Sequence, residues 1–316
     1  MLWRLITRRL IFSLYTLLAV AIFVFIAAEI LPGDAAQAML GQAATQETVD
    51  ALRRELGLDR SAFERFFIWI GNLLQGNFGL SYSTRTPVID QMALRLPATL
   101  LLGGVVTLVA VPLSVVLGLV CAVMPGSMID RIINTTALCL VSIPDFLMAT
   151  LLVVLFAVTL NWLPAISQMN NGMSAGEIAR ALALPTITLT FLVFAPMVRM
   201  TRNAIINVLS SPSIEMAMLK GVPRRRIIIH HALPNALGPI VNVISINLAY
   251  LLSGVIIVEY IFAYPGVAKF MVDGVSSRNL PVVQICALFF CAVYIAMNLL
   301  ADIIAMLANP RLRHPK

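Results

Sequence analysis

Long apolar segments alternate with short polar ones along the whole chain. Because about 20 apolar residues in a helix cross the hydrocarbon core of a bilayer, this pattern predicts six transmembrane helices. The segments are Leu10–Ile30, Ala98–Met124, Ile132–Leu160, Leu184–Arg199, Ala236–Val258 and Val282–Leu307. The third is long enough to tilt or to break at Pro144. The fourth is short, so we expect its helix to continue beyond Arg199.

Composition supports a membrane protein. The 316 residues are 60% hydrophobic and only 12% charged, and the mean hydropathy is +0.93. Soluble domains are about 45–50% apolar and about 25% charged, so the predicted fold class is an all-α polytopic membrane protein. Four cysteines lie in predicted spans, where they are expected to act as small hydrophobes rather than in disulfides or zinc sites. They are Cys121, Cys139, Cys286 and Cys291.

The first apolar segment follows Arg4, Arg8 and Arg9, a pattern shared with secretory signal peptides. A signal peptide has an apolar region of about 7–15 residues and then a small-residue cleavage site. This segment is longer and ends in Glu29–Asp34. We therefore expect a retained transmembrane helix.

The basic residues indicate the orientation, since short cytoplasmic loops are enriched in Lys and Arg. With the N-terminus inside, the cytoplasmic segments hold most of these residues and only two acids, Asp130 and Glu215. Their basic residues are Arg4, Arg8, Arg9, Arg131, Arg199, Arg202, Lys220, Arg224, Arg225, Arg226, Arg311, Arg313 and Lys316. The short external loops hold Arg180, Lys269 and Arg278. Both termini are predicted to be cytoplasmic, and the net charge of +7 reflects this sorting rather than nucleic acid binding.

Residues 32–96 form the one long polar part. Thr45–Arg65 has the pattern of an amphipathic helix, Phe66–Leu74 is apolar but too short to span, and Gly76–Ser81 is rich in turn residues. This segment is either a small external subdomain on the outer membrane surface or a cap on the helix bundle.

A short helix with clear end signals lies between the fourth and fifth spans. Ser211 can cap it, Pro212 suits its first position, and Glu215 lies in its first turn. Gly221 can take a left-handed conformation and Pro223 prevents continuation. The orientation places this helix on the cytoplasmic side.

No arrangement of residues typical of an enzyme is present. His230 and His231 are adjacent and cannot point the same way on a helix, and we expect them to be interfacial side chains without chemistry. The chain has no GxxxxGK[ST] phosphate-binding motif. It is therefore predicted to be a transport subunit without its own ATP-binding site.

The cytoplasmic helix carries a family resemblance. Glu215-Met216-Ala217-Met218-Leu219-Lys220-Gly221, followed after nine residues by His231-Ala232-Leu233-Pro234, resembles the EAA loop of the inner-membrane permeases of ABC importers. Two positions depart from that pattern, Met216 in place of alanine and His231 in place of isoleucine.

Further segments resemble one branch, the dipeptide/oligopeptide/nickel permeases, and in particular their first, B-type subunit. They occur in family order from one end of the chain to the other. They are Leu31–Asp34, Leu56–Asp59, Gly76–Ser81, Pro87-Val88, Arg95–Leu100, Leu163-Pro164, Arg199, Arg202, Val258–Phe262, Pro265-Gly266, Pro281–Gln284, Asn298–Asp302 and Asn309–Arg313.

The resemblance implies the type I ABC importer permease fold in a bacterial inner membrane. It also implies a heteromer with a second homologous permease, two ATP-binding subunits and a periplasmic or lipid-anchored solute-binding protein. ATP and Mg²⁺ would be bound by the ATPase subunits, and no catalytic residue, cofactor or metal is expected in this chain. The implied organisation is an N-tail and first helix (1–31), an external segment (32–96), a five-helix core (97–307) with the EAA loop at 200–235, and a cytoplasmic tail (308–316).

In such permeases the EAA loop forms a coupling helix that sits in a cleft of the ATPase. The resemblance assigns this role to Glu215 and Gly221, with Ala217 and Met218 supplying the docking face. Arg224 and Arg225, with Arg226, either reach ATPase acids or lipid phosphates or act as ordinary positive-inside anchors.

Polar residues inside a membrane are costly and are candidates for function. Asp145 either lines the translocation path, pairs with Arg199, or caps the helix that restarts after Pro144. Glu259 and Tyr260 either form an outer gate or anchor the fifth span. Asp302 is expected to pack or cap.

The predicted function is import of peptides or a similar small solute as one permease subunit. Nickel chelates and other non-peptide solutes stay open as cargo. An ion-coupled secondary transporter is the alternative of another class, although neither an internal repeat nor a proton relay is evident. A membrane-embedded scaffold subunit would not need the capped helix.

Overall fold

The computed structural model describes residues 2–30, 34–41, 44–170 and 172–308. These residues are helical apart from turns, loops and one isolated bridge between Leu80 and Pro87. Residues 309–316 of the tail expected at 308–316, and residues 31–33 of the family-like segment 31–34, lie outside the described residues. The chain forms two compact units, the first of Met1–Ile6, Leu101–Ala263 and Tyr294–Lys316, the second of Thr7–Leu100 and Tyr264–Val293.

Among the described residues, five helices are long and apolar enough to cross a membrane, and a bent helix pair provides a sixth candidate span. The long helices are α1 (Leu2–Ile30), α5 (Val88–Val123), α8 (Ala175–Leu209), α11 (Leu233–Ile261) and α13 (Leu280–Ala308). The six predicted segments all fall on these elements, so the all-α membrane fold is confirmed.

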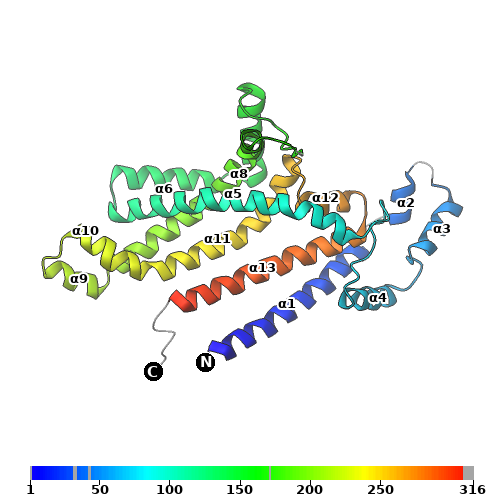
Figure 1. Ribbon diagram of the computed structural model, residues 1–316, viewed down its shortest axis with the longest axis horizontal. Helices are drawn as coiled ribbons and strands as arrows, with labels where there is room; N and C mark the ends of the chain where they lie inside the picture. The colour runs from blue at the N-terminus through cyan, green and yellow to red at the C-terminus, as the bar shows by residue number, and fades with distance from the viewer. Residues whose placement is uncertain (1, 31–33, 42–43, 171, 309–316) are drawn as a thin grey trace. The chain divides into compact units, whose positions relative to one another are not determined.

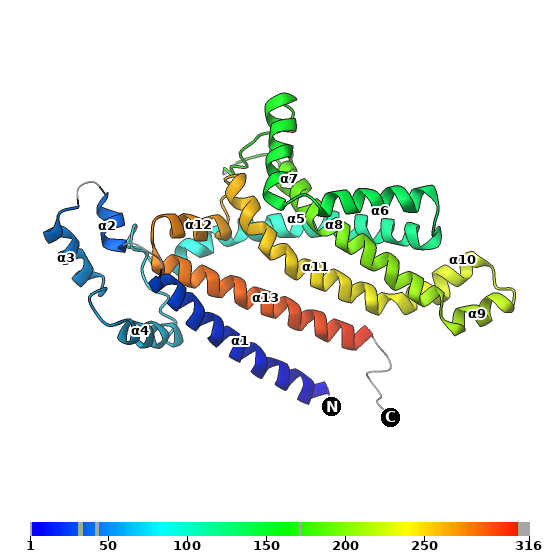
Figure 2. The same cartoon turned by 180° about the vertical axis from the view of Figure 1, so that it is seen from behind.

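The third predicted span is broken, as the proline suggested. It consists of α6 (Met128–Val141) and α7 (Asp145–Leu152), and α7 continues as the π-helix η2 (Val153–Thr159). The two halves meet at 103° (Figure 2). Pro144 lacks an N–H and disfavours helical geometry at the residue before it, which ends α6.

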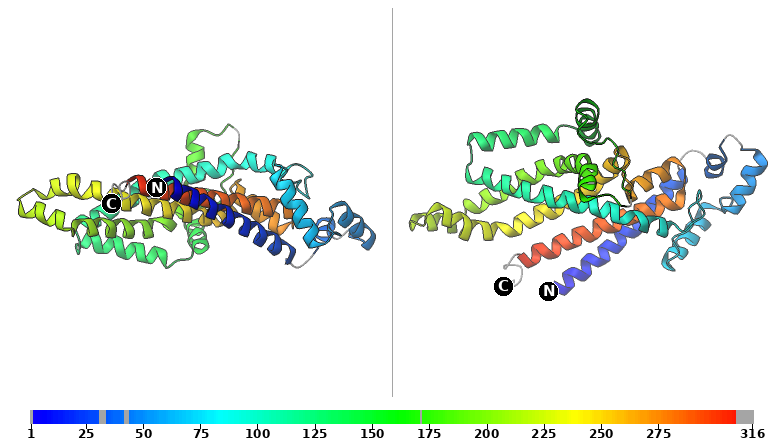
Figure 3. Two further views of the ribbon diagram at one scale, coloured as in Figure 1. Left: turned by 90° about the horizontal axis from the view of Figure 1, so that it is seen from below. Right: turned by 45° about the horizontal axis from the view of Figure 1, so that its top comes forward.

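Helix α8 forms the centre of the first unit and packs on α11 and α6 (Figure 3). Its prediction as a short span was wrong at the N-terminus, where α8 begins nine residues before Leu184, at Ala175. Ser174 and Glu177 form a capping box there. The predicted continuation past Arg199 is confirmed.

Glycines set the close approach of these helices. A Cβ on Gly118 of α5 would lie 2.9 Å from the Val198 carbonyl oxygen and 2.8 Å from Thr201 Cβ of α8. A Cβ on Gly254 of α11 would overlap the Leu192 side chain of α8. Small residues at helix contacts allow backbones to approach, which stabilises packing inside a membrane.

The second unit contains most of α1, the start of α5 and α13, and four short helices. The short helices are α2 (Ala35–Leu40), α3 (Gln46–Glu55), α4 (Ala62–Leu74) and α12 (Val267–Ser276). The single amphipathic helix predicted over Thr45–Arg65 is wrong: Gly57 has φ +67° between α3 and α4, and Thr45 and Ser61 cap them separately. Phe25 of α1 packs on Phe66 of α4 with ring centroids 5.2 Å apart.

Candidate functional site

A sharp elbow joins α8 to α11 (Figure 1). It is built from α9 (Pro212–Leu219), α10 (Arg224–Arg226) and the π-helical turn η3 (Ile227–Ala232), which runs directly into α11. Pro212 starts α9 as predicted. Ser211 occupies the capping position with extended backbone angles, but its hydroxyl contacts Ser213 Oγ at 3.0 Å instead of capping the helix. The predicted cap hydrogen bond is therefore absent.

The other end of α9 is closed by a complete left-handed turn. Gly221 has φ +75°, and its N–H donates to the Met218 carbonyl at 2.9 Å. The Val222 N–H donates to the Ala217 carbonyl at 3.2 Å. These two bonds define a Schellman motif, which needs a residue that tolerates positive φ. The predicted role of Gly221 as the helix stop is confirmed.

One side of α9 is anchored to the elbow. Ile214 is 2% exposed and packs with Ile227 and Ala232 in a small buried cluster. Partly buried residues surround the cluster, namely Val208, Leu209, Ala217 and Val222. Ala217 thus faces inward rather than lying on the outer face expected for it.

The opposite side of α9 presents large apolar side chains. Met216, Met218 and Leu219 are 54%, 51% and 77% exposed, and Glu215 is also exposed. An apolar patch on a short helix outside the apolar spans, rimmed by a charge, is typical of a surface that binds a protein partner.

The arginines after Pro223 differ in their contacts. Arg224 Nη2 donates to the Val123 carbonyl at the end of α5 at 2.7 Å, so this side chain ties the elbow to a second helix. Arg225 and Arg226 are exposed, as are His230 and His231 in η3.

A charged network that the sequence analysis missed lies on α6 and α8. Asp130 is 4% exposed and forms a bidentate pair with Arg202, with Nε–Oδ1 and Nη2–Oδ2 distances of 2.7 and 2.8 Å. Asp130 also accepts from the Gly126 N–H and the Asn134 amide. The sequence held one signal of this network: Asp130 is a single acid in a basic loop. A carboxylate that becomes buried requires a partner of opposite charge.

Asp145 starts α7, where a negative charge suits the helix N-terminus. It is half-buried and lines a cavity of about 380 Å³ together with side chains of α8 and α11. The lining residues from those helices are Phe191, Leu192, Pro196, Met200, Ile246, Asn247 and Tyr250. Within the described part of the chain, Asp145 makes no ion pair with Arg199, so that alternative is not observed.

Glu259 and Tyr260 are adjacent on α11 but differ in environment. Glu259 is fully buried and Tyr260 is 53% exposed. The two residues expected together, as an outer gate or as anchors of the fifth span, therefore have different environments.

A tight turn at Ser81–Ser83 is held by one asparagine, Asn279. Asn279 Oδ1 accepts from the Tyr82 N–H at 3.0 Å, and Nδ2 donates to Ser81 and Ser83. Burial raises the pKa of the Tyr82 phenol, while the nearby charge of Arg65 lowers it.

Among the described residues, no group of three or more His, Cys, Asp or Glu side chains is placed to hold a metal ion.

Apolar helices long enough to cross a membrane, two of them joined by an elbow with an exposed short helix, define a multi-pass membrane protein. The chain belongs to the binding-protein-dependent transport system inner membrane component family, whose model matches residues 114–314. The model for the N-terminal part of such membrane components matches residues 1–103. The chain is thus a permease subunit of a bacterial inner-membrane ABC transporter, as the sequence resemblance predicted.

The chain is similar over nearly its full length to other permeases, of which two serve as examples. The chain is 33% identical over 311 residues to "Probable peptide ABC transporter permease protein y4tP" of Sinorhizobium fredii, covering 98% of this chain and 99% of that one. It is 34% identical over 309 residues to the glutathione transport system permease protein GsiC of Escherichia coli (strain K12), covering 98% of each.

Proposed function

We propose that this chain and a second, homologous permease form the translocation path of an ATP-driven importer of peptides or similar small solutes. The printed functions of the two relatives, peptide and glutathione transport, support this class of cargo. An external solute-binding protein delivers the cargo to the side of residues 32–96. Two ATPase subunits bind ATP and Mg²⁺ on the cytoplasmic side, where both chain termini and α9 lie.

The way α9 is built supports its proposed role in coupling to an ATPase. Ile214 fixes one side to the elbow, the Schellman motif at Gly221 stops the helix, and the opposite side is exposed. A helix built in this way moves as a body when a partner pushes on it.

We infer that Met216, Met218 and Leu219 dock on an ATPase and that Glu215 makes a polar contact beside them. Closure of two ATPases on ATP then turns the elbow, and α8 and α11 transmit the movement because they continue directly from it. Arg225 is exposed and available to the same partner, whereas Arg224 positions the elbow through Val123.

The cavity beside Asp145 is part of the proposed translocation path. A half-buried carboxylate where a span is broken offers a site for a cationic group, such as the amino terminus of a peptide. Glu259, buried near the end of α11, and the exposed Tyr260 act at the outer end of this path.

The test uses the complete transporter with its binding protein, reconstituted in liposomes. Leu219→Asp places a charge in the docking face without touching the buried cluster, and Glu215→Ala removes the polar contact. We expect Leu219→Asp to lower ATP-driven uptake at least about tenfold and to release the ATPase during purification. A smaller loss of uptake, with the complex intact, is expected for Glu215→Ala.

Met128→Asp is the matched control, because Met128 is 73% exposed as the first residue of α6, on a different helix from α9. Its uptake and ATPase content should match those of the unmodified protein. Full uptake and full ATPase content in Leu219→Asp would refute the coupling role of α9. Equal losses in Leu219→Asp and Met128→Asp would show a general effect of added charge instead.

A further inference from the structure

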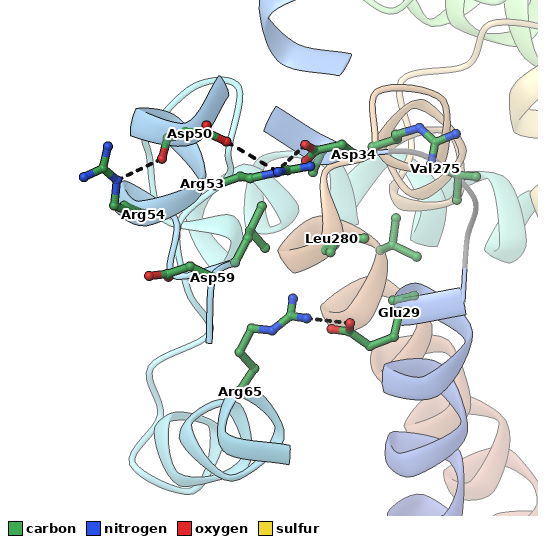
Figure 4. Close-up of a pocket in the computed structure, with 14 residues that line it drawn as sticks. Glu29, Asp34, Asp50, Arg53, Arg54, Asp59, Arg65, Val275 and Leu280 are labelled. Carbon is green, nitrogen blue, oxygen red and sulfur yellow. Dashed lines mark hydrogen bonds and ion pairs between the residues drawn. The ribbon is translucent and has the colours of Figure 1, made fainter. Parts of the chain in front are cut away.

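A charged pocket lies in the second unit, in the part of the chain that includes the external segment (Figure 4). Its volume is about 760 Å³, within the range of roughly 300–1,000 Å³ typical of small-ligand sites. The walls come from the end of α1, from the segment of α2 to α4, and from the end of α12, the start of α13 and the turn between them. The charged residues that line the pocket are different from those of the coupling elbow and of the cavity beside Asp145.

The pocket balances opposite charges. It is lined by four acids, Glu29, Asp34, Asp50 and Asp59, and by four arginines, Arg53, Arg54, Arg65 and Arg278. Such a wall does not select a ligand of one net charge. A ligand that carries both an anionic and a cationic group matches it.

Several of these charged side chains already form ion pairs with one another. Arg53 Nε lies 2.6 Å from Asp34 Oδ2, and Arg53 Nη1 lies 3.5 Å from Asp50 (Figure 4). Arg65 Nη2 lies 2.6 Å from Glu29 Oε2. No ion pair occupies Arg278 or Asp59 among the residues that the structure describes.

Arg278 is held in a conformation that arginine seldom adopts. Its φ is +52°, at the end of α12, where its N–H donates to the Val275 carbonyl and the Asn279 N–H donates to Gly274. This is the left-handed position of a Schellman motif, which glycine usually fills. A side chain with a Cβ is disfavoured in this conformation, and strained residues cluster at functional sites.

Arg65 supplies a second donor. Its Nε is buried and has no hydrogen-bond partner among the described residues, although its Nη2 pairs with Glu29. A buried donor without an acceptor is costly. A carboxylate oxygen in the pocket would satisfy it, because guanidinium groups bind carboxylates with charge-assisted hydrogen bonds.

We propose that this pocket binds a small zwitterion, with its carboxylate at Arg278 and Arg65 and its ammonium group at Asp59. The choice of a short peptide with free termini as that zwitterion rests on the proposed function. The pocket then gives the transporter a peptide site on its external side, separate from the binding protein and from the cavity beside Asp145.

Binding is measured on the membrane complex of permeases and ATPases in nanodiscs, without the external binding protein, by titration with radiolabelled dialanine. We expect dialanine to bind more tightly than its C-terminal amide or its N-acetyl form, each by at least about tenfold. Arg278→Gly should weaken dialanine binding at least about tenfold while it relieves the positive φ, so a loss of binding is not explained by unfolding. Arg278→Lys should retain most of the affinity.

Arg85→Gly is the matched control. Arg85 also has a positive φ, +58°, and pairs with Glu55, but it does not line the pocket. Dialanine affinity should be unchanged in this variant. Equal affinity for dialanine, its amide and its N-acetyl form, or equal effects of Arg278→Gly and Arg85→Gly, would overturn the zwitterion site.

ATP-driven uptake of dialanine with the binding protein present separates this inference from the proposed function. Uptake without selective binding in the pocket would leave the importer role standing and remove the site. Selective binding without uptake of any peptide would remove the peptide-import role and leave a zwitterion site.

Discussion

Helices α8 and α1 look alike in sequence but occupy different environments. Both are long apolar helices that qualify as membrane spans, and α1 is the more apolar of the two. Yet 72% of the most apolar 18-residue window of α8 is buried within the protein, against 11% for α1. Hydropathy therefore measures suitability for the membrane and not burial within the protein, because lipid tails are as apolar as a protein core.

What distinguishes α8 is its small and polar side chains. Thr186, Thr188, Thr190 and Thr201 are all buried on it, and Gly118 of α5 contacts it closely. The outward-facing side chains of α1 are large instead, with Leu14, Tyr15 and Phe23 between 65% and 70% exposed. Small residues permit close contact between helices, whereas large apolar ones suit lipid.

The largest expected difference is between two phenylalanines. Phe194 of α8 is 8% exposed and packs with Ala137, Ala195 and Val198, so Phe194→Ala should leave a cavity and lower the free energy of unfolding by about 3 kcal/mol. Phe23 of α1 is 70% exposed, so Phe23→Ala should change it by about 0.5 kcal/mol or less. Thermal unfolding of each purified variant in mild detergent measures both. Equal losses would show that α1 is packed as tightly as α8.

An effect of similar size is expected at the ion pair on α8. Asp130→Ala leaves the partly buried Arg202 without its carboxylate, and we expect a loss of about 3 kcal/mol in the free energy of unfolding. Asp273→Ala is the control, since Asp273 is exposed and its i,i+4 pair with Lys269 should contribute about 1 kcal/mol or less. If the double variant Asp130→Ala, Arg202→Ala is no more stable than Asp130→Ala alone, the unpaired Arg202 guanidinium is not the cause of the lost stability.

A smaller loss is expected at the contact between α5 and α8. Gly118→Ala forces a Cβ against the α8 backbone, which should cost about 2 kcal/mol in the free energy of unfolding. Gly103→Ala, on the same helix with open space around it, should be neutral or slightly stabilising. The two variants are compared by thermal unfolding in the same detergent. A stable Gly118→Ala protein would mean that the two helices can separate without cost.

Local signals were enough for several features of the fold and site. Pro144 marked the break between α6 and α7 as one of two alternatives for the third span, and Gly221 and Pro223 predicted the end of α9. The early start of α8 was missed, although Ser174 and Glu177 have the spacing of a capping box. The inward position of Ala217 could not be read from α9 alone, because it depends on Ile227 and Ala232 beyond the turn.

The sequence by itself determined the membrane spans, the short helix of the elbow and the family, because each rests on neighbouring residues or on motifs in order. Only the tertiary structure decided which apolar helix is buried and which residues pair over long separations. Asp130 meets Arg202 across 72 residues, and the pocket joins Glu29 and Arg65 to the strained Arg278. These outcomes depend on packing between distant segments, which apolar periodicity does not encode when lipid and protein are equally good apolar surroundings.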